Sequence, residues 1–117
     1  MDTTKKRLIQ LVLDKTNSGL LTWSRGSMAN EYKTELASAA LHISYGIYDG
    51  LSDVGPTQVI SVHMYNGTGA PITLVSENDT HPEFEMLYKL YNAAQDSCTR
   101  ESETIVNLME ELNALGK

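Results

Sequence analysis

Apolar residues recur at alternating steps of three and four over the last third of the chain. From Phe84 to Leu115 the seam runs through Phe84, Leu87, Tyr91, Ala94, Cys98, Glu101, Ile105, Leu108, Leu112 and Leu115. This spacing places the a and d positions of a heptad repeat on one face of a helix. Thr80 and Glu83 have the spacing of a capping box, and neither glycine nor proline interrupts the seam. The pattern predicts a helix over 81–115.

The predicted helix is too long for a compact body of this size. At ~1.5 Å per residue it would extend about 50 Å, whereas a compact chain of this length is only about 35 Å across. One alternative is a break within 95–102, where Ser97 and Thr99 have modest helix propensity and Glu101 puts a charge on the seam. A break would give a helical hairpin packed on its own chain. The lack of a strong breaker favours the unbroken or merely bent helix.

An unbroken helix leaves the apolar end of the seam outside the body. We expect a second copy of the chain to cover it, so that the protein forms a homodimer through a coiled-coil-like contact. Parallel and antiparallel pairing are both compatible with the pattern. The predicted interface residues are Ile105, Leu108, Met109, Leu112 and Leu115.

The preceding residues show two further periodicities. Residues 3–17 have the period of an amphipathic helix, with one face formed by Leu8, Leu11, Val12 and Lys15 and with Ile9 and Leu13 beside it. Apolar and polar side chains then alternate with period two as far as residue 76, which predicts strands. The five expected strands cover 21–24, 32–36, 41–48, 60–65 and 72–75, with turns at 26–30, 38–39, 49–56 and 66–69.

Short links between successive strands predict an antiparallel meander with one covered face and one wetter face. Both helices should pack on the covered face, because each has an apolar stripe to bury. We therefore predict that 1–117 form a single α+β domain in two layers.

The composition narrows the classes of function. A net charge of −6 and a pI of about 4.9 disfavour binding to nucleic acid and to anionic membranes. No apolar run approaches the ~20 residues of a membrane span, and the N-terminus does not resemble a signal peptide. The single cysteine excludes an internal disulfide and is typical of a reducing compartment, so we expect a cytoplasmic location.

The segment from Leu13 to Trp23 carries a resemblance. It contains the pattern K-T-x-x-G-x-L-x-W, and the pairs Leu87-Tyr88 and Leu90-Tyr91 follow in the last helix. In these features the chain resembles a loose group of small, uncharacterised bacterial and phage proteins with a helix, this junction, a meander and a C-terminal helix. The resemblance implies the same architecture and a prokaryotic or phage origin, and it implies no active site.

Two histidines and the cysteine are the residues to weigh for chemistry. His42 and His63 fall on the wetter face of the predicted sheet, where Glu35 or Glu31 could complete a two-histidine, one-carboxylate metal site. No short-range ligand spacing supports such a site, so we predict surface histidines and no metal or other cofactor. Cys98 lies on the heptad seam far in sequence from any histidine, which favours a buried small residue over a catalytic thiol.

The chain contains six tyrosines and one phenylalanine. Because tyrosine combines an apolar ring with a hydrogen-bonding hydroxyl, this balance is typical of interfaces and ligand-binding clefts. Tyr48, His63 and Tyr65 form a candidate contact patch on the outer sheet face. Arg25, one of few arginines, is a candidate contact for an anionic group.

Two functions fit these observations. The first is a non-enzymatic, oligomeric interaction protein that binds another protein, such as an inhibitor or accessory factor encoded by a phage or mobile element. The alternative is a small-molecule binding protein, for a nucleotide-like signal, with a pocket between sheet and helix or at the dimer interface. The alternative requires arginine and tyrosine side chains that converge in a cavity.

Overall fold

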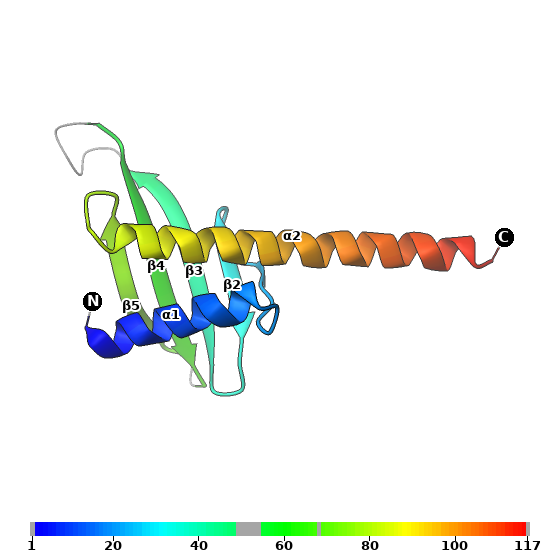
Figure 1. Ribbon diagram of the computed structural model, residues 1–117, viewed down its shortest axis with the longest axis horizontal. Helices are drawn as coiled ribbons and strands as arrows, with labels where there is room; N and C mark the ends of the chain where they lie inside the picture. Colours follow the sequence, from blue (N-terminus) through cyan, green and yellow to red (C-terminus); the bar gives the residue numbers. More distant parts are fainter. Residues whose placement is uncertain (1, 49–54, 68, 117) are drawn as a thin grey trace.

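The computed structural model describes residues 2–48, 55–67 and 69–116. It contains an N-terminal helix, a five-stranded antiparallel sheet and a long C-terminal helix, which confirms the predicted α+β fold. The molecule measures 61 × 34 × 26 Å, and its long dimension follows the C-terminal helix (Figure 1). Most of the predicted turn at 49–56, and Thr68 in the turn at 66–69, lie outside the described residues.

Helix α1 spans Thr3–Asn17, the predicted range. It begins at Asp2, whose side chain accepts a hydrogen bond from the backbone N–H of Lys5 at 2.8 Å, as an N-cap should. It ends before Gly19, which has a φ of +79° and lets the chain reverse without steric strain.

The buried face of α1 differs from the predicted one. Its buried residues are Ile9, Val12, Leu13 and Thr16. Leu11 and Lys15, which were assigned to the covered face, are exposed. The face is rotated because Thr16 points inward and satisfies its hydroxyl there, a contribution that a hydrophobic pattern does not register.

The sheet is a meander in chain order. Its strands are β1 (Ser24–Arg25), β2 (Glu31–Glu35), β3 (Ala39–Tyr48), β4 (Thr57–Asn66) and β5 (Pro71–Asn78), and each pairs antiparallel with the next. The central register pairs His42 with His63 and Ile43 with Val62. A shift after Val62 places His63 opposite Thr73, so β5 carries one extra residue there.

The first strand is shorter and later than the 21–24 predicted from its alternation. Two backbone groups before it bond to side chains instead of to a neighbouring strand. The N–H of Trp23 donates to Ser97 Oγ at 3.0 Å, and the carbonyl of Thr22 accepts from Thr34 Oγ1 at 2.8 Å. The segment therefore acts as an extended link that crosses from α1 to the sheet.

Helix α2 spans Phe84–Ala114 and continues without a break through 95–102. The predicted start at 81 and the predicted capping box are wrong. Glu83 is the N-cap and makes no side-chain cap bond, while the side chain of Asn78 accepts from Thr80 and holds a turn before the helix. That turn competes with capping because an Asn side chain can bond the backbone two residues on.

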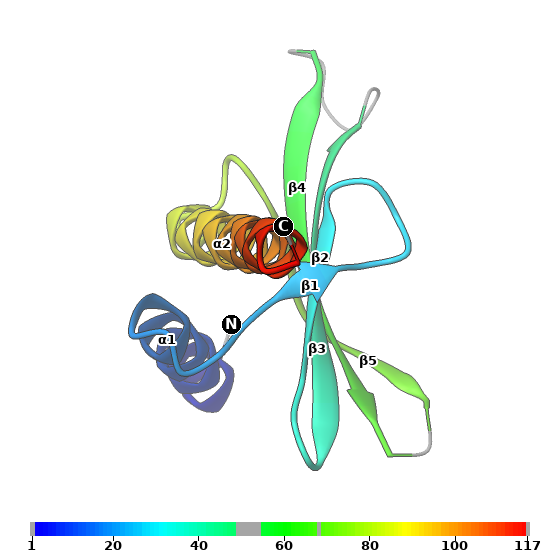
Figure 2. The ribbon, with the colours of Figure 1, turned by 90° about the vertical axis from the view of Figure 1, so that its right-hand side faces the viewer.

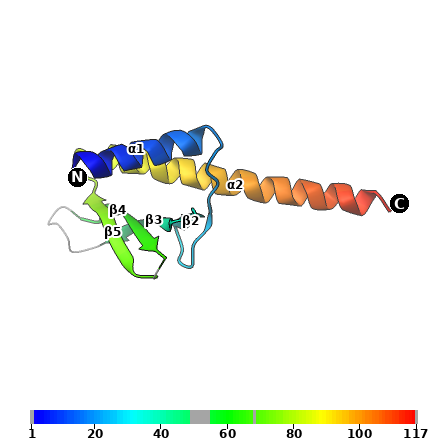
Figure 3. The ribbon, with the colours of Figure 1, turned by 90° about the horizontal axis from the view of Figure 1, so that it is seen from below.

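Both helices lie on the same side of the sheet, as Figures 2 and 3 show. The core between the layers contains Trp23 from the link, Ile43 and Ile60 from the sheet, and Leu87 and Leu90 from α2, all at 1% exposure or less. Helix α2 crosses the strands and leaves the body at the β1–β2 edge (Figure 1). The last buried residue of α2 is Cys98, as predicted for this seam position.

Candidate functional site

The C-terminal half of α2 projects from the body with its apolar side chains uncovered. Every described residue from Thr99 onward is exposed, and Figures 1 and 3 show the helix extending beyond the sheet and α1. The apolar members are between 51% and 80% exposed; they are Ile105, Val106, Leu108, Met109, Leu112 and Leu115. Five of them are the predicted interface residues, and Val106, one position off the seam, was missed.

The exposed side chains continue the buried stripe of the same helix. Leu87, Tyr91, Ala94 and Cys98 are buried, and the same alternation of three and four then passes through the charged Glu101 to Ile105, Leu108, Leu112 and Leu115. Steps of three and four residues keep side chains on one face of a helix. The stripe therefore passes from the core into solvent without changing direction.

The projecting part of α2, residues 99–114, makes its own local hydrogen bonds. Thr104 Oγ1 donates to the carbonyl of Arg100 at 2.9 Å, a back-bond within the helix. A segment of this length is marginally stable as an isolated helix in water. A second surface along its apolar face would add the tertiary packing that such a helix otherwise lacks.

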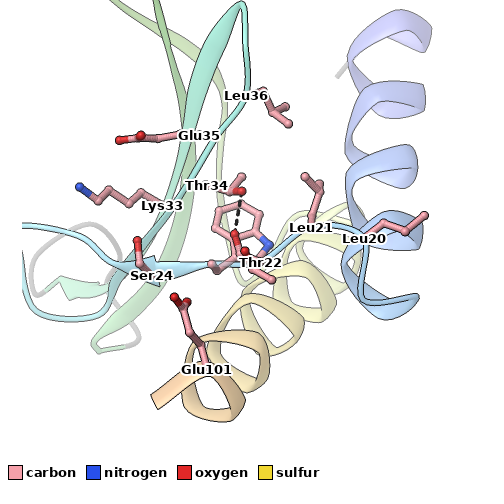
Figure 4. A pocket seen from close by; sticks show the side chains of 10 residues that line it. Leu20, Leu21, Thr22, Ser24, Lys33, Thr34, Glu35, Leu36 and Glu101 are labelled. Atoms are coloured by element: carbon pink, nitrogen blue, oxygen red, sulfur yellow. Dashed lines mark hydrogen bonds between the residues drawn. The ribbon is translucent and has the colours of Figure 1, made fainter. Parts of the chain in front are cut away.

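Two hollows lie where α2 leaves the body. One is a cavity of about 440 Å³ between the α1–β1 link and β2, whose wall includes Lys33, Glu35 and Glu101. Figure 4 shows the side chains of this cavity, with the Thr34–Thr22 hydrogen bond at its centre. The other is a groove of about 350 Å³ between the end of α1 and α2, lined by Thr16, Gly19, Leu21, Thr22, Ser97, Arg100, Glu101, Thr104 and Ile105.

These hollows bring together residues that are far apart in sequence, and sequence patterns did not predict them. Leu20, which lines the cavity beside β2, is 71% exposed although it follows a helix and precedes a strand. Leu36, on the wall of the cavity, is 49% exposed. The only sequence signal was the pair of leucines at positions 20 and 21 beside the conformationally free Gly19.

The outer face of the sheet carries polar residues in rows across the strands. Lys33, His42, His63 and Thr73 form one row in the register of β2 to β5. The His42 ring lies 4.5 Å from the Tyr65 ring, and His63 Nδ1 shares a hydrogen bond of 3.1 Å with Thr73 Oγ1. In the described part of the chain, no other element covers this face (Figure 2).

The histidine and glutamate side chains that were weighed as a metal set on this face do not converge on one site. His42 Nδ1 lies 3.6 Å from Glu31 Oε1, but the same Glu31 oxygen accepts the backbone N–H of Ser27 at 3.1 Å. His63 is bonded to Thr73 instead, and Glu35 lies opposite Ala40 in the next row. The glutamate thus holds the turn that follows β1, and the histidines make separate contacts.

The four candidate contact residues occupy different places. His63 and Tyr65 lie on the outer face near one end of the β3–β4 ladder, and Tyr48 lies at its other end, opposite Thr57. Arg25 pairs with Tyr32, whose ring packs on Tyr91 of α2, so Arg25 belongs to the helix-covered side. The structure therefore brings His63 and Tyr65 together and separates Arg25 and Tyr48 from them.

Among the described residues, one group has ligand atoms close enough for a metal ion: Glu77, His81 and Glu83, within 4.8 Å of one another. The backbone N–H of Glu83 donates to His81 Nδ1 at 3.1 Å, and Nε2 of the same ring lies 3.7 Å from Glu77 Oε2. The cluster therefore orders the turn into α2, and sequence reasoning overlooked its i,i+4 spacing.

Three tyrosines meet between the sheet and α2. The rings of Tyr32 and Tyr45 each lie 5.5 Å from the ring of Tyr91. Burial, with the neighbouring Tyr32 and Tyr45, raises the pKa of Tyr91 to about 12. These rings contribute to packing and do not face the outer patch.

Comparison with protein-family models, curated proteins and solved structures found no match for the chain. The resemblance at the α1–β1 junction therefore stays a prediction, although its residues have clear structural roles: Thr16 and Trp23 share a buried hydrogen bond, and Gly19 makes the reversal. No described helix combines the length and hydropathy that crossing a bilayer requires.

Proposed function

We propose that the protein acts by binding, as a non-enzymatic interaction protein that self-associates through the projecting half of α2. The observation that carries the proposal is the exposed stripe, which continues the buried face of the same helix from Cys98 to Leu115. Monomeric soluble proteins rarely leave a contiguous apolar stripe uncovered. A homodimer that covers it would explain why the seam extends beyond the body.

The stripe contains enough apolar surface to support a pair of moderate affinity. Full burial of a Val, Leu, Ile or Met side chain contributes about 1.5–3 kcal/mol. Four of the five interface residues are between 51% and 59% exposed and Leu115 is 80% exposed, so full burial of these side chains in both copies would contribute at most roughly 9–18 kcal/mol. Association costs ~4–15 kcal/mol in lost freedom. Contacts beyond the stripe would therefore strengthen the pair.

A dimer of this kind would leave the outer sheet face free for another protein. That face carries His63 and Tyr65 beside His42 and Lys33, a mixture of rings and hydrogen-bonding groups suited to an interface. The overall charge of −6 favours a basic partner. An inhibitor or accessory factor encoded by a phage or mobile element would work in this way.

The nucleotide-like ligand has less support. Arg25 does not share a face with His63 and Tyr65. The cavity beside β2 holds the carboxylates of Glu35 and Glu101 against the single ammonium of Lys33, a balance that disfavours an anion.

Light scattering on the purified protein tests the proposal. We expect a mass about twice the 12.9 kDa of one chain. Leu108→Asp should give a folded monomer, with the dissociation constant raised at least about 100-fold, because the shared interface would then bury an unpaired charge from each chain.

The matched control is Asn107→Asp, which adds the same charge one position off the stripe and should leave the dimer intact. A wild-type protein that stays monomeric at tens of micromolar would refute self-association. A Leu108→Asp variant that unfolds would show that the stripe is covered by its own chain.

A further inference from the structure

The body of the molecule limits the ways in which two copies can share the stripe. In the first half of α2 the stripe faces the sheet and α1, which already cover Leu87, Tyr91 and Cys98. In the second half the same side of the helix is open. Figure 3 shows the sheet, α1 and the projecting helix in this arrangement.

A parallel partner does not fit this arrangement. Packed helices lie 8–10 Å apart, roughly side by side. If a parallel partner packed along the projecting stripe, the first half of its α2 would occupy the same space as the sheet and α1 of the first copy. An antiparallel partner runs back toward the body, and its own sheet lies beyond the free end of the first helix.

We propose that two copies pair antiparallel through 105–115, with the C-terminal end of each α2 seated against the body of the other. This proposal rests on the self-association proposed above and specifies its geometry. A second copy of this chain therefore covers the open face at the base of the projecting helix. Leu115 of that copy is the residue that contacts this face.

The register follows from the heptad positions and from the buried Cys98. In an antiparallel pair, a positions of one helix face d positions of the other. Placing Leu115 opposite Ile105 also places Leu108 opposite Leu112, which gives four apolar layers. The next deeper register would require Leu115 to occupy the surroundings of Cys98, which is only 8% exposed within its own body. The next shallower register keeps only the layers that pair Leu112 with Leu115.

This register makes use of the groove at the base of the helix. Ile105 and Thr104 form one wall, and Gly19 and Leu21 from the α1–β1 link form the opposite wall. A partner's Leu115, which is 80% exposed in the single chain, would meet this rim. Glu101 stays outside the apolar layers, so the charge on the seam is not buried.

Cysteine crosslinking tests orientation and register together. The background is Cys98→Ala, and the variants are Ile105→Cys and Leu115→Cys on separate chains. Each variant alone should form almost no disulfide on oxidation, because its two copies lie ten residues apart along the antiparallel pair, about 15 Å at ~1.5 Å per residue. An equimolar mixture should form a disulfide-linked heterodimer on a non-reducing gel.

The control mixture is Asn107→Cys with Leu115→Cys, since Asn107 lies off the stripe and should react at least ten-fold more slowly. Crosslinking of Leu115→Cys with itself would indicate a parallel pair and overturn the proposal. A dimer by light scattering without the heterodimer crosslink would overturn the register while leaving self-association in place. A monomer by light scattering would refute both proposals. If the Cys98→Ala background is unstable, the same mixture in the native background, where Cys98 is buried, gives the same readout.

Discussion

Trp23 donates its indole N–H to Thr16 Oγ1 at 2.9 Å, and the Thr16 hydroxyl in turn donates to the carbonyl of Val12 at 2.8 Å. Both side chains are 1% exposed. The backbone N–H of Trp23 is also bonded, to Ser97 Oγ at 3.0 Å. One residue thus joins α1, the link to the sheet and α2 through polar groups that water does not reach.

Thr16→Val should lower the free energy of unfolding by about 1–3 kcal/mol, because the nearly isosteric side chain leaves the indole N–H buried without an acceptor. Urea denaturation followed by circular dichroism, which does not depend on Trp23, measures the loss. A double-mutant cycle with Trp23→Phe supplies the control. Once the indole N–H is gone, Thr16→Val should cost measurably less. Equal costs in the two backgrounds would mean that the hydrogen bond does not stabilise the fold.

Gly19→Ala should destabilise the protein by about 1–2 kcal/mol through backbone strain, since a side chain disfavours the left-handed region. Gly19 has a φ of +79°, and a Cβ there would meet no atom within 4 Å, so steric contact is not the cause. Gly67 is the matched control, because a Cβ there is equally free and its φ lies outside that region. Thermal unfolding of the two alanine variants should show a loss only for Gly19→Ala.

Periodicity alone is sufficient to predict the main elements. The period of two from Tyr32 to Val75 and the steps of three and four after Phe84 reflect which side chains face the core, and hydrophobic burial is the dominant favourable contribution to folding. The range of α1, the meander and the continuous α2 all follow. The overhang follows as well, because helix length is proportional to residue number.

The sequence-based predictions fail where polar side chains make specific bonds. Thr16 rotates the buried face of α1 because its hydroxyl has partners inside, and Asn78 delays the start of α2 by holding Thr80. Bonds of this kind depend on geometry that a hydrophobicity pattern does not contain. The groove at the base of the projecting helix was equally out of reach, because Gly19 and Ile105 meet only once the fold has formed.

The stability of the fold should fall as the pH rises from about 10 to about 12. The pKa of Tyr91 is raised to about 12 by burial and by Tyr32 and Tyr45, above the value of ~10 of an exposed tyrosine. The folded state therefore holds the phenolic proton more tightly than the unfolded state. The stabilisation that this tighter proton binding gives the folded state is complete below pH ~10 and is lost as the pH approaches 12. The free energy of unfolding should therefore fall by at most about 3 kcal/mol over this range.

Denaturation curves of the wild type and of Tyr91→Phe across this range isolate the contribution of Tyr91. The variant loses the contact of its hydroxyl with Tyr32, so it should start less stable but show a flatter dependence on pH. The same fall in both proteins would assign the alkaline sensitivity to other groups.

A chain that ends at Ser102 should keep the body and lose the dimer. Every described residue from Thr99 onward is exposed in the single chain, so at low protein concentration the free energy of unfolding should change by less than ~0.5 kcal/mol. The melting temperature of the full chain should rise with protein concentration, as expected when association stabilises the folded state, and that of the shortened chain should not. A shortened chain that no longer unfolds cooperatively would show that the projecting helix is needed by its own body.

Glu111→Gln should tighten the antiparallel dimer. In an antiparallel pair, the g positions of the two helices lie next to each other along one side of the apolar layers. Glu111 occupies a g position, and in the proposed register it faces Glu111 of the second copy. Repulsion between like charges at such a distance weakens a pair by a few tenths of a kcal/mol, so the dissociation constant should fall about two- to three-fold at low salt. Because salt screens exposed charges, the difference should disappear near 1 M.

Glu110→Gln is the matched control, since position 110 points away from the partner and should leave the dissociation constant unchanged. In a parallel pair Glu111 would face Gly116 instead, and Glu111→Gln would behave like the control. Sedimentation of the two variants at low and high salt therefore tests the orientation without any crosslink, through the charge that the antiparallel register brings close to itself.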